Sequence, residues 1–271
     1  MANVTSFPSR SRSVAPSFAA AKILIVPACA LVAWLSVVRA RWVNSVILPP
    51  PEEVLGTAAQ QVRSGDFWIA FTSSLARMAS GYAIAVAFGL ALGLLLGISP
   101  WAQRLVAPTF HGVRQIAPFA WIPLLSAWTG TGESTKVAFI AVASFAPTVL
   151  GTMEGARSVA SGHKELARIL EVGTLPFIRD VVLPSAMPGV LSGLHMSLVS
   201  AWLATVGAEF FLQVSPGLTG ILMEGRALTR MDIVVFGLVV IASVGFGLSA
   251  GMAGLERYAL RWRPRRNTSN V

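Results

Sequence analysis

The chain has 271 residues, of which 54% are hydrophobic and only 12% are charged, and its formal net charge is +9. A soluble domain has about a quarter of its residues charged, so the composition excludes an ordinary soluble protein and indicates one that crosses a membrane several times. The basic excess does not indicate nucleic-acid binding, because the bases lie at the chain ends and between apolar runs, as the positive-inside bias predicts. The single cysteine, Cys29, excludes an intrachain disulfide.

The N-terminal part predicts a tail, one span and an external segment. Residues 1–21 are rich in Ser, Arg and Pro and predict a disordered cytoplasmic tail. Residues 22–66 then predict a first span, from Lys22 to about Val38, and an external stretch with an amphipathic helix starting near Glu52. A cleaved signal peptide is the alternative for the first span, but the polar lead is long and no small-x-small site follows the apolar run.

The second predicted span, about 67–98, carries small residues at every fourth position, which places them on one face of a helix. This smooth stripe predicts a face for close helix packing, either within the chain or across a dimer. Its members are Gly81, Ala85, Gly89, Gly93 and Gly97.

The third predicted span, about Ala107 to Trp128, follows an inner turn and is broken by Pro108, Pro118 and Pro123, which together predict an irregular helix. Prolines are tolerated in a span only where neighbours or a water-filled path satisfy the freed carbonyl groups. The span is therefore a candidate to line a transport path, and a kinked structural helix is the alternative.

Three further spans complete a predicted all-α membrane protein with six transmembrane helices. Counting Lys and Arg with the N-terminus inside gives about thirteen on the cytoplasmic side and about six outside, which favours two cytoplasmic termini. The remaining predicted segments are a fourth span at 134–153, a fifth at 185–212, an external stretch with an SPGLTG turn at 213–229, a sixth span at 230–255 and a basic cytoplasmic tail at 257–271.

The longest polar interruption, Glu154 to Gly189, predicts two short helices between the fourth and fifth spans. Leu166, Ile169 and Leu170 share one face of the first helix, so that face must bury against lipid headgroups, the chain itself or a soluble partner. No phosphate-binding loop accompanies it, because GTGESTK at 130–136 lacks the Gly-Lys-Ser/Thr order of such a loop.

This interruption resembles the EAA loop of ABC-importer permeases. The motif is carried by Glu165-Leu166-Ala167 and, at the matching distance, Val181-Val182-Leu183-Pro184. Two positions depart from the family pattern: Leu166 replaces the middle Ala, and Glu171 stands where the family has Gly, with a Gly only at 173. The resemblance covers about 49–264. It is nearest to permeases for taurine, alkanesulfonates and nitrate, which 121–136 and 207–232 also resemble.

The resemblance implies a bacterial inner-membrane permease with a transmembrane domain at 67–256. It implies cytoplasmic ATPase subunits that hydrolyse ATP, a periplasmic or lipid-anchored substrate-binding protein, and a second permease chain that is often identical. The chain itself would be no enzyme and would carry no cofactor. Coupling to the ATPase would run through the loop at 159–184, with coupling positions at Glu165, Leu166, Ala167, Ile169, Leu170, Glu171, Gly173, Leu183 and Pro184.

The implied substrate is a small organic or inorganic oxyanion such as a sulfonate, taurine or nitrate. Bicarbonate, pyrimidine precursors and aromatic acids remain alternatives within the same class of importer. A secondary transporter without an ATPase is disfavoured, because several mid-span carboxylates would be needed as coupling-ion ligands and these are nearly absent. A membrane-embedded enzyme is disfavoured because no catalytic residues converge.

Charged residues within spans are expensive and are usually paired or functional. Arg77 either snorkels, pairs structurally or attracts an anion. Glu209 either gates the path or pairs with Arg226 or Arg230, and we favour the pairing. Arg114 follows a predicted cytoplasmic helix start. The histidines are scattered, so no metal site is predicted. The candidate path residues are Arg77, Pro118, Trp121, Pro123 and Glu209.

Overall fold

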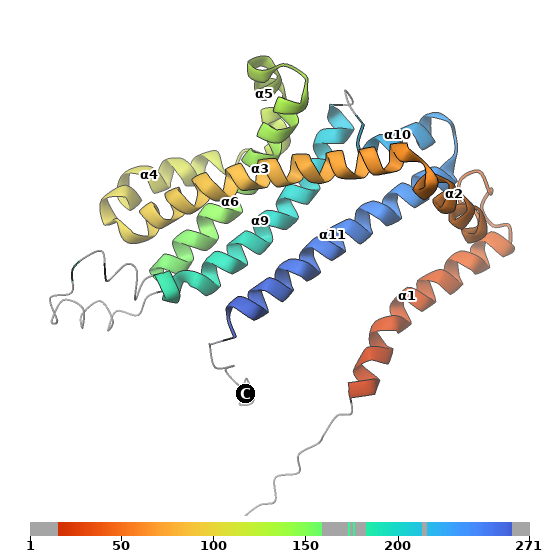
Figure 1. Cartoon of the computed structure of the whole chain (residues 1–271), viewed down its shortest axis with the longest axis horizontal. Helices are drawn as coiled ribbons and strands as arrows, with labels where there is room; N and C mark the ends of the chain where they lie inside the picture. Colours follow the sequence, from red (N-terminus) through yellow and green to blue (C-terminus); the bar gives the residue numbers. More distant parts are fainter. Residues whose placement is uncertain (1–15, 159–172, 174–175, 177–182, 213–215, 262–271) are drawn as a thin grey trace, which may run out of the picture.

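The computed structural model describes residues 16–158, 173, 176, 183–212 and 216–261, and all regular structure among them is helical (Figure 1). Four of these helices are long and apolar enough to cross a membrane, and they match the predicted second, fourth, fifth and sixth spans. They are α3 (Gly65–Ile98), α6 (Glu133–Arg157), α9 (Leu183–Phe211) and α11 (Met231–Ala259). Helix α1 (Pro16–Arg39) covers the predicted first span and begins inside the predicted tail.

The third predicted span is wrong as a single helix. Its residues form the end of α4 (Pro100–Val113), the 3-10 helix η1 (Pro118–Trp121) and α5 (Ile122–Thr129). Pro118 causes the break, because a residue that precedes proline avoids the helical region and Ala117 is accordingly extended, with φ −56° and ψ 134°. Pro108 lies inside α4 and Pro123 lies in the first turn of α5.

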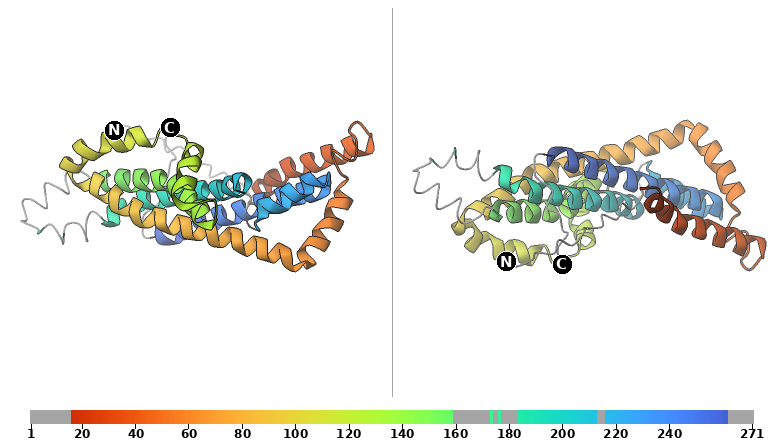
Figure 2. Two further views of the ribbon diagram at one scale, coloured as in Figure 1. Left: turned by 90° about the horizontal axis from the view of Figure 1, so that it is seen from above. Right: turned by 90° about the horizontal axis from the view of Figure 1, so that it is seen from below.

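The predicted inner turn after α3 is itself the start of α4. Ser99 caps α4 by accepting a hydrogen bond from the backbone N–H of Ala102, and Pro100 occupies the first turn, where its missing N–H costs little. Figure 2 shows α4 folding back from the end of α3. The chain after α4 therefore resumes beside an earlier part of α3, and α6 then returns to the end of α3, where Gly97 faces Ala156.

Helices α3, α6 and α9 pack at backbone distance. A Cβ on Gly151 would lie 2.3 Å from Cα of Gly193, and one on Gly155 would lie 2.5 Å from the carbonyl oxygen of Ala186. Without glycines at this crossing, α6 and α9 would have to separate. The small-residue stripe of α3 faces α6 in the same way: added Cβ atoms on its glycines would lie within 2.7 Å of side-chain atoms of Ile140, Thr148, Thr152 and Ala156.

A second set of contacts joins α2 to the start of α11. Helix α2 (Pro51–Arg63) begins beside the predicted start at Glu52, and its Thr57 Oγ1 donates a hydrogen bond to Asp232 of α11 across 175 residues of chain. Arg230 also pairs with Asp232, at 2.6 Å, and this partner raises the pKa of Arg230 and keeps its guanidinium charged. The predicted external stretch contains a helix that the sequence analysis missed, α10 (Leu218–Ala227).

The elements divide between two ends of the molecule (Figure 1). The end of α6, the start of α9 and the end of α11 lie toward one end, whereas α2 and α10 lie toward the other. The chain between α6 and α9, which contains the predicted coupling loop, therefore leaves the fold on the side where α11 also ends.

Candidate functional site

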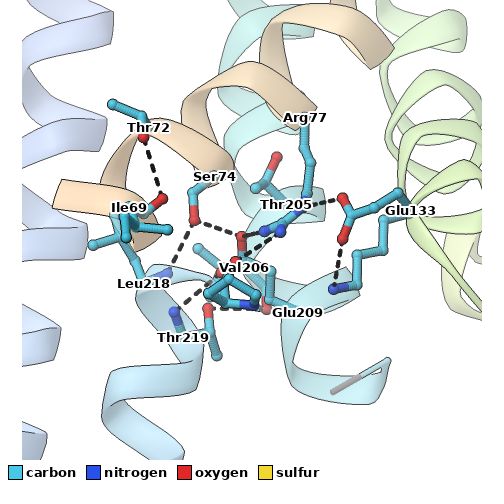
Figure 3. Close-up of polar contacts among 12 residues, drawn as sticks. Ile69, Thr72, Ser74, Arg77, Glu133, Thr205, Val206, Glu209, Leu218 and Thr219 are labelled. Carbon is cyan, nitrogen blue, oxygen red and sulfur yellow. Dashed lines mark hydrogen bonds and ion pairs between the residues drawn. The ribbon is translucent and has the colours of Figure 1, made fainter. Parts of the chain in front are cut away.

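Arg77 of α3 is the centre of a buried polar cluster (Figure 3). Only 6% of the residue is exposed. Its Nη1 lies 2.7 Å from Oε1 of Glu209 on α9, its Nε donates to Glu133 on α6, and its Nη2 donates to the carbonyl oxygen of Pro216 at 2.7 Å. One guanidinium thus joins three long helices and the entry to α10.

Glu209 receives hydrogen bonds from several sides. Ser74 Oγ donates to Glu209 Oε1, and the backbone N–H of Thr219 donates to Oε2 at 3.1 Å. This places the carboxylate at the N-terminus of α10, where the helix dipole favours negative charge. Gly217 permits the approach, because an added Cβ would lie 2.4 Å from the carboxyl carbon.

The favoured pairing of Glu209 with Arg226 or Arg230 is therefore wrong. The partner of Glu209 is Arg77, and Arg230 binds Asp232 instead. A partner on α3 is preferred because Glu209 is 4% exposed, so its charge must be neutralised inside the protein.

Lys136 completes the cluster. Its side chain is fully buried, and its Nζ lies 3.5 Å from Oε1 of Glu133, whose side chain is 51% exposed. The cluster therefore holds two cations and two anions, and Glu133 is the member that solvent reaches. Sequence reasoning missed both residues, although GTGESTK places opposite charges where a span begins.

A separate apolar hollow of about 470 Å³ lies between α3, α4, η1 and α6. Two of the five candidate path residues, Pro118 and Trp121, line it, whereas Arg77 and Glu209 belong to the polar cluster and Pro123 belongs to neither. The hollow has one charged lining residue, Arg114, and its walls are otherwise apolar: Ile84, Ala85, Phe88, Phe110, Val113, Ile116, Pro118, Trp121, Ala141, Val142, Ala143, Phe145 and Ala146.

A second open hollow, of about 550 Å³, borders Glu133. Ile84 and Ala141 line both hollows, so the two meet along the groove between α3 and α6. The groove runs from the exposed carboxylate of the polar cluster to the guanidinium of Arg114. The groove therefore connects the polar cluster with the first hollow, the two sites that contain four of the five candidate path residues.

The position of Arg114 differs from the sequence-based interpretation. Arg114 was placed near a cytoplasmic helix start, but α4 begins at Pro100 and Arg114 is the residue that ends it. A helix of this length is about 20 Å long. Arg114 therefore lies at the end of α4 that is far from the turn at Ser99.

Most predicted coupling positions lie outside the described residues: Glu165, Leu166, Ala167, Ile169, Leu170 and Glu171. Of the others, Gly173 is exposed, Leu183 is the first residue of α9 and Pro184 follows it in the first turn. The predicted coupling loop is thus attached directly to the helix that crosses α6 at its glycines.

Within the part of the chain that the structure describes, no group of three His, Cys, Asp or Glu side chains could hold a metal ion. His195 of α9 instead lies against α11, with Nε2 2.9 Å from Ser249 Oγ and Nδ1 3.7 Å from a carboxylate oxygen of Glu256.

Tightly packed apolar helices of membrane-spanning length and a buried charged cluster between them define a multi-pass helical membrane protein. Comparison with known proteins gives the family. The family of binding-protein-dependent transport system inner membrane components matches residues 85–258, and the chain belongs to this family. It is a multi-pass inner-membrane permease subunit of an ABC importer and not itself an enzyme. A separate ATPase and a binding protein are the partners that this membership implies.

Individual relatives agree with this assignment. The chain is 30% identical to the taurine transport system permease protein TauC of Escherichia coli (strain K12), over 86% of each chain. It is 31% identical to the putative aliphatic sulfonates transport permease protein SsuC of Bacillus subtilis (strain 168), over 89% of this chain and 87% of the relative. A solved structure of the MetNI methionine ABC transporter shares the fold, with a TM-score of 0.57 and 18% identity over 69% of this chain and 93% of that chain.

Proposed function

We propose that two copies of this chain form the membrane path for a small oxyanion and that residues 159–184 couple the path to the ATPase. In this proposal each copy contributes six spans, with both termini in the cytoplasm. The printed names of two relatives, which concern taurine and aliphatic sulfonates, support a sulfonate-like substrate. Bicarbonate, a pyrimidine precursor or an aromatic acid remains the alternative cargo.

The observation that carries the coupling proposal is the construction of the α6–α9 pair. The two helices flank the predicted loop and cross where Gly151 and Gly155 meet Gly193 and Gly189. Because the two backbones are in direct contact at this crossing, we expect a displacement of the loop to move both helices together. The pair acts as a rigid lever.

The far end of the lever reaches the polar cluster. Glu133 is the first residue of α6, and Glu209 lies near the end of α9, so both carboxylates that bind Arg77 belong to the lever. A displacement that starts at the loop therefore acts on the attachment of α3. We propose that this linkage opens and closes the groove between α3 and α6.

The proposal is tested by pull-down of the detergent-extracted chain with its ATPase. We expect the wild type to retain the ATPase and Ala167→Asp to lose it, because a carboxylate on the apolar docking face costs several times the binding energy of a neutral contact. Ser161→Asp is the matched control, since it adds the same charge to the same loop outside the apolar face and should bind as the wild type does.

A second measurement separates docking from coupling. In proteoliposomes that contain the complete importer, Glu165→Lys should leave ATP hydrolysis in place and abolish uptake. Normal uptake by this variant at equal protein level would show that the loop does not couple. If the wild-type chain retains no ATPase under any condition, a transporter that works alone becomes the function to test.

A further inference from the structure

Arg114 is a charged residue in the wrong place for a lipid-facing surface. It is exposed, and within the described residues its guanidinium makes no hydrogen bond or ion pair. The hollow lies about 15–20 Å from the turn at Ser99, whether the distance is measured along α4 to Arg114 or back along α3 to Phe88. The hydrocarbon layer of a membrane is about 30 Å thick.

The turn itself has the composition of a membrane surface. Trp101, which is 72% exposed, and Arg104 follow Ser99 directly, and Trp and Arg are the residues that favour the interface on the cytoplasmic side. With this turn at the membrane surface, about 15–20 Å along the helices would leave Arg114 inside the hydrocarbon layer. A guanidinium at that depth is costly unless it faces water, an anion or another protein group.

The walls around Arg114 indicate which anion would fit. The side chains of Phe88, Val113, Ile116 and Trp121 offer an apolar surface, with Phe88 67%, Val113 46% and Ile116 45% exposed. A guanidinium binds an oxyanion with two parallel hydrogen bonds. The apolar walls gain nothing from a bare inorganic anion, but they gain from a hydrocarbon body attached to one.

We propose that this hollow is a substrate-binding station within the permease, distinct from the binding protein. It takes an organic anion with one oxyanion head and a short hydrocarbon body. The head pairs with Arg114, and the body lies against Phe88, Val113 and Trp121. This inference rests on the proposed transport of a small oxyanion, and it adds that the permease itself discriminates among such anions by their apolar part.

Position favours a transport station over a lipid site. The hollow adjoins the second hollow through Ile84 and Ala141, and that second hollow opens beside Glu133 at the outer end of α6. A solute released outside therefore meets the polar cluster first and Arg114 further along the same groove.

Calorimetric titration tests the station on the permease–ATPase complex in nanodiscs of zwitterionic lipid, without the binding protein. The probes are hexanesulfonate, which has head and body, nitrate, which resembles the head alone, and hexanol, which has the body alone; empty nanodiscs correct for partitioning. We expect saturable binding of hexanesulfonate, at least tenfold tighter than that of either other probe. Arg114→Gln should weaken it at least tenfold, and Phe88→Ala should weaken it several-fold.

Arg104→Gln is the matched control, because it removes the same charge from an exposed position on the same helix outside the hollow. It should bind hexanesulfonate as the wild type does. Wild-type binding that does not saturate would overturn the station, because it would show only partitioning of the probe, and equal binding by Arg114→Gln would overturn the role of the guanidinium. ATPase retention by Arg114→Gln, measured in the same preparation, keeps this outcome separate from a failure of the coupling proposal.

Discussion

Arg77 and Arg114 are two arginines within the apolar part of one chain, and the protein treats them in opposite ways. Arg77 is 6% exposed and is held by two carboxylates and a carbonyl oxygen from three other elements. Arg114 ends a helix, is exposed and is the one charged residue that lines the apolar hollow. The first cation holds helices together, whereas the second is the residue to which the proposed station assigns the oxyanion.

Removal of the buried cation tests most directly whether Arg77 and Arg114 have different roles. Arg77→Ala leaves Glu209 charged and enclosed, and loss of one partner from a buried ion pair costs about 3–5 kcal/mol. We expect a large fall in the free energy of unfolding, measured by denaturation in detergent. Arg114→Ala should change it by less than about 0.5 kcal/mol.

A double variant shows whether the Arg77 effect is electrostatic. Arg77→Gln combined with Glu209→Gln removes both charges, so it should recover much of the stability that Arg77→Ala loses. Equal destabilisation by Arg77→Ala and Arg114→Ala would mean that the two arginines are not treated differently.

A smaller effect is expected at the other end of the lever. Gly155→Ala places a methyl group 2.5 Å from the carbonyl oxygen of Ala186, and such overpacking costs about 1–3 kcal/mol. Gly247→Ala is the matched control, because no atom lies within 4 Å of its added Cβ. It should stabilise α11 slightly, since alanine is the better helix former. Denaturation of both variants side by side measures the difference.

The exposed member of the polar cluster sharpens the contrast within the cluster. Glu133→Gln should cost about 1 kcal/mol, because a half-exposed carboxylate keeps much of its hydration and contributes less than a buried one. Its effect should also shrink as salt is added, since solvent ions screen exposed charges. Glu209→Gln should be more damaging and less sensitive to salt, and the reverse order would contradict the burial that distinguishes the two carboxylates.

The smallest stability effect is expected in the hollow. Phe88 is 67% exposed, so Phe88→Ala removes little packing and should change the free energy of unfolding by less than about 0.5 kcal/mol. Its effect should instead appear in the binding of hexanesulfonate. A loss of several kcal/mol on denaturation would mean that Phe88 supports the fold rather than a ligand surface.

The sequence predicted best where one segment carries its own signal. The apolar run of α3 is long enough to identify without tertiary information, and the glycine spacing on it is a local pattern. Helix α10 has only ten residues, so it was taken for a turn. The three prolines predicted an irregular third span, but not its division into α4, η1 and α5, because the restriction that Pro118 places on Ala117 breaks a helix without fixing where the next one runs.

The polar cluster could not be assembled from the sequence for a different reason. Arg77 is separated by 56 residues from Glu133 and by 132 from Glu209, so no local pattern reports the pairing. Charge inside predicted spans was a usable signal that something must neutralise it. Which residues do so depends on the packing of α3 against α6 and α9, and the small-residue stripe predicts a packing face without naming its partner.

The bond between Thr57 and Asp232 has a consequence for the synthesis of the protein. The two residues are 175 positions apart, and a ribosome that adds about 5–20 residues per second needs roughly 10–35 s to cover that distance. Helix α2 is synthesised early, but α11, to which it binds, is the last helix of the described chain to be synthesised. The newborn chain therefore holds α2 without this partner for most of its synthesis, and the contact between α2 and α11 forms only when translation is almost complete.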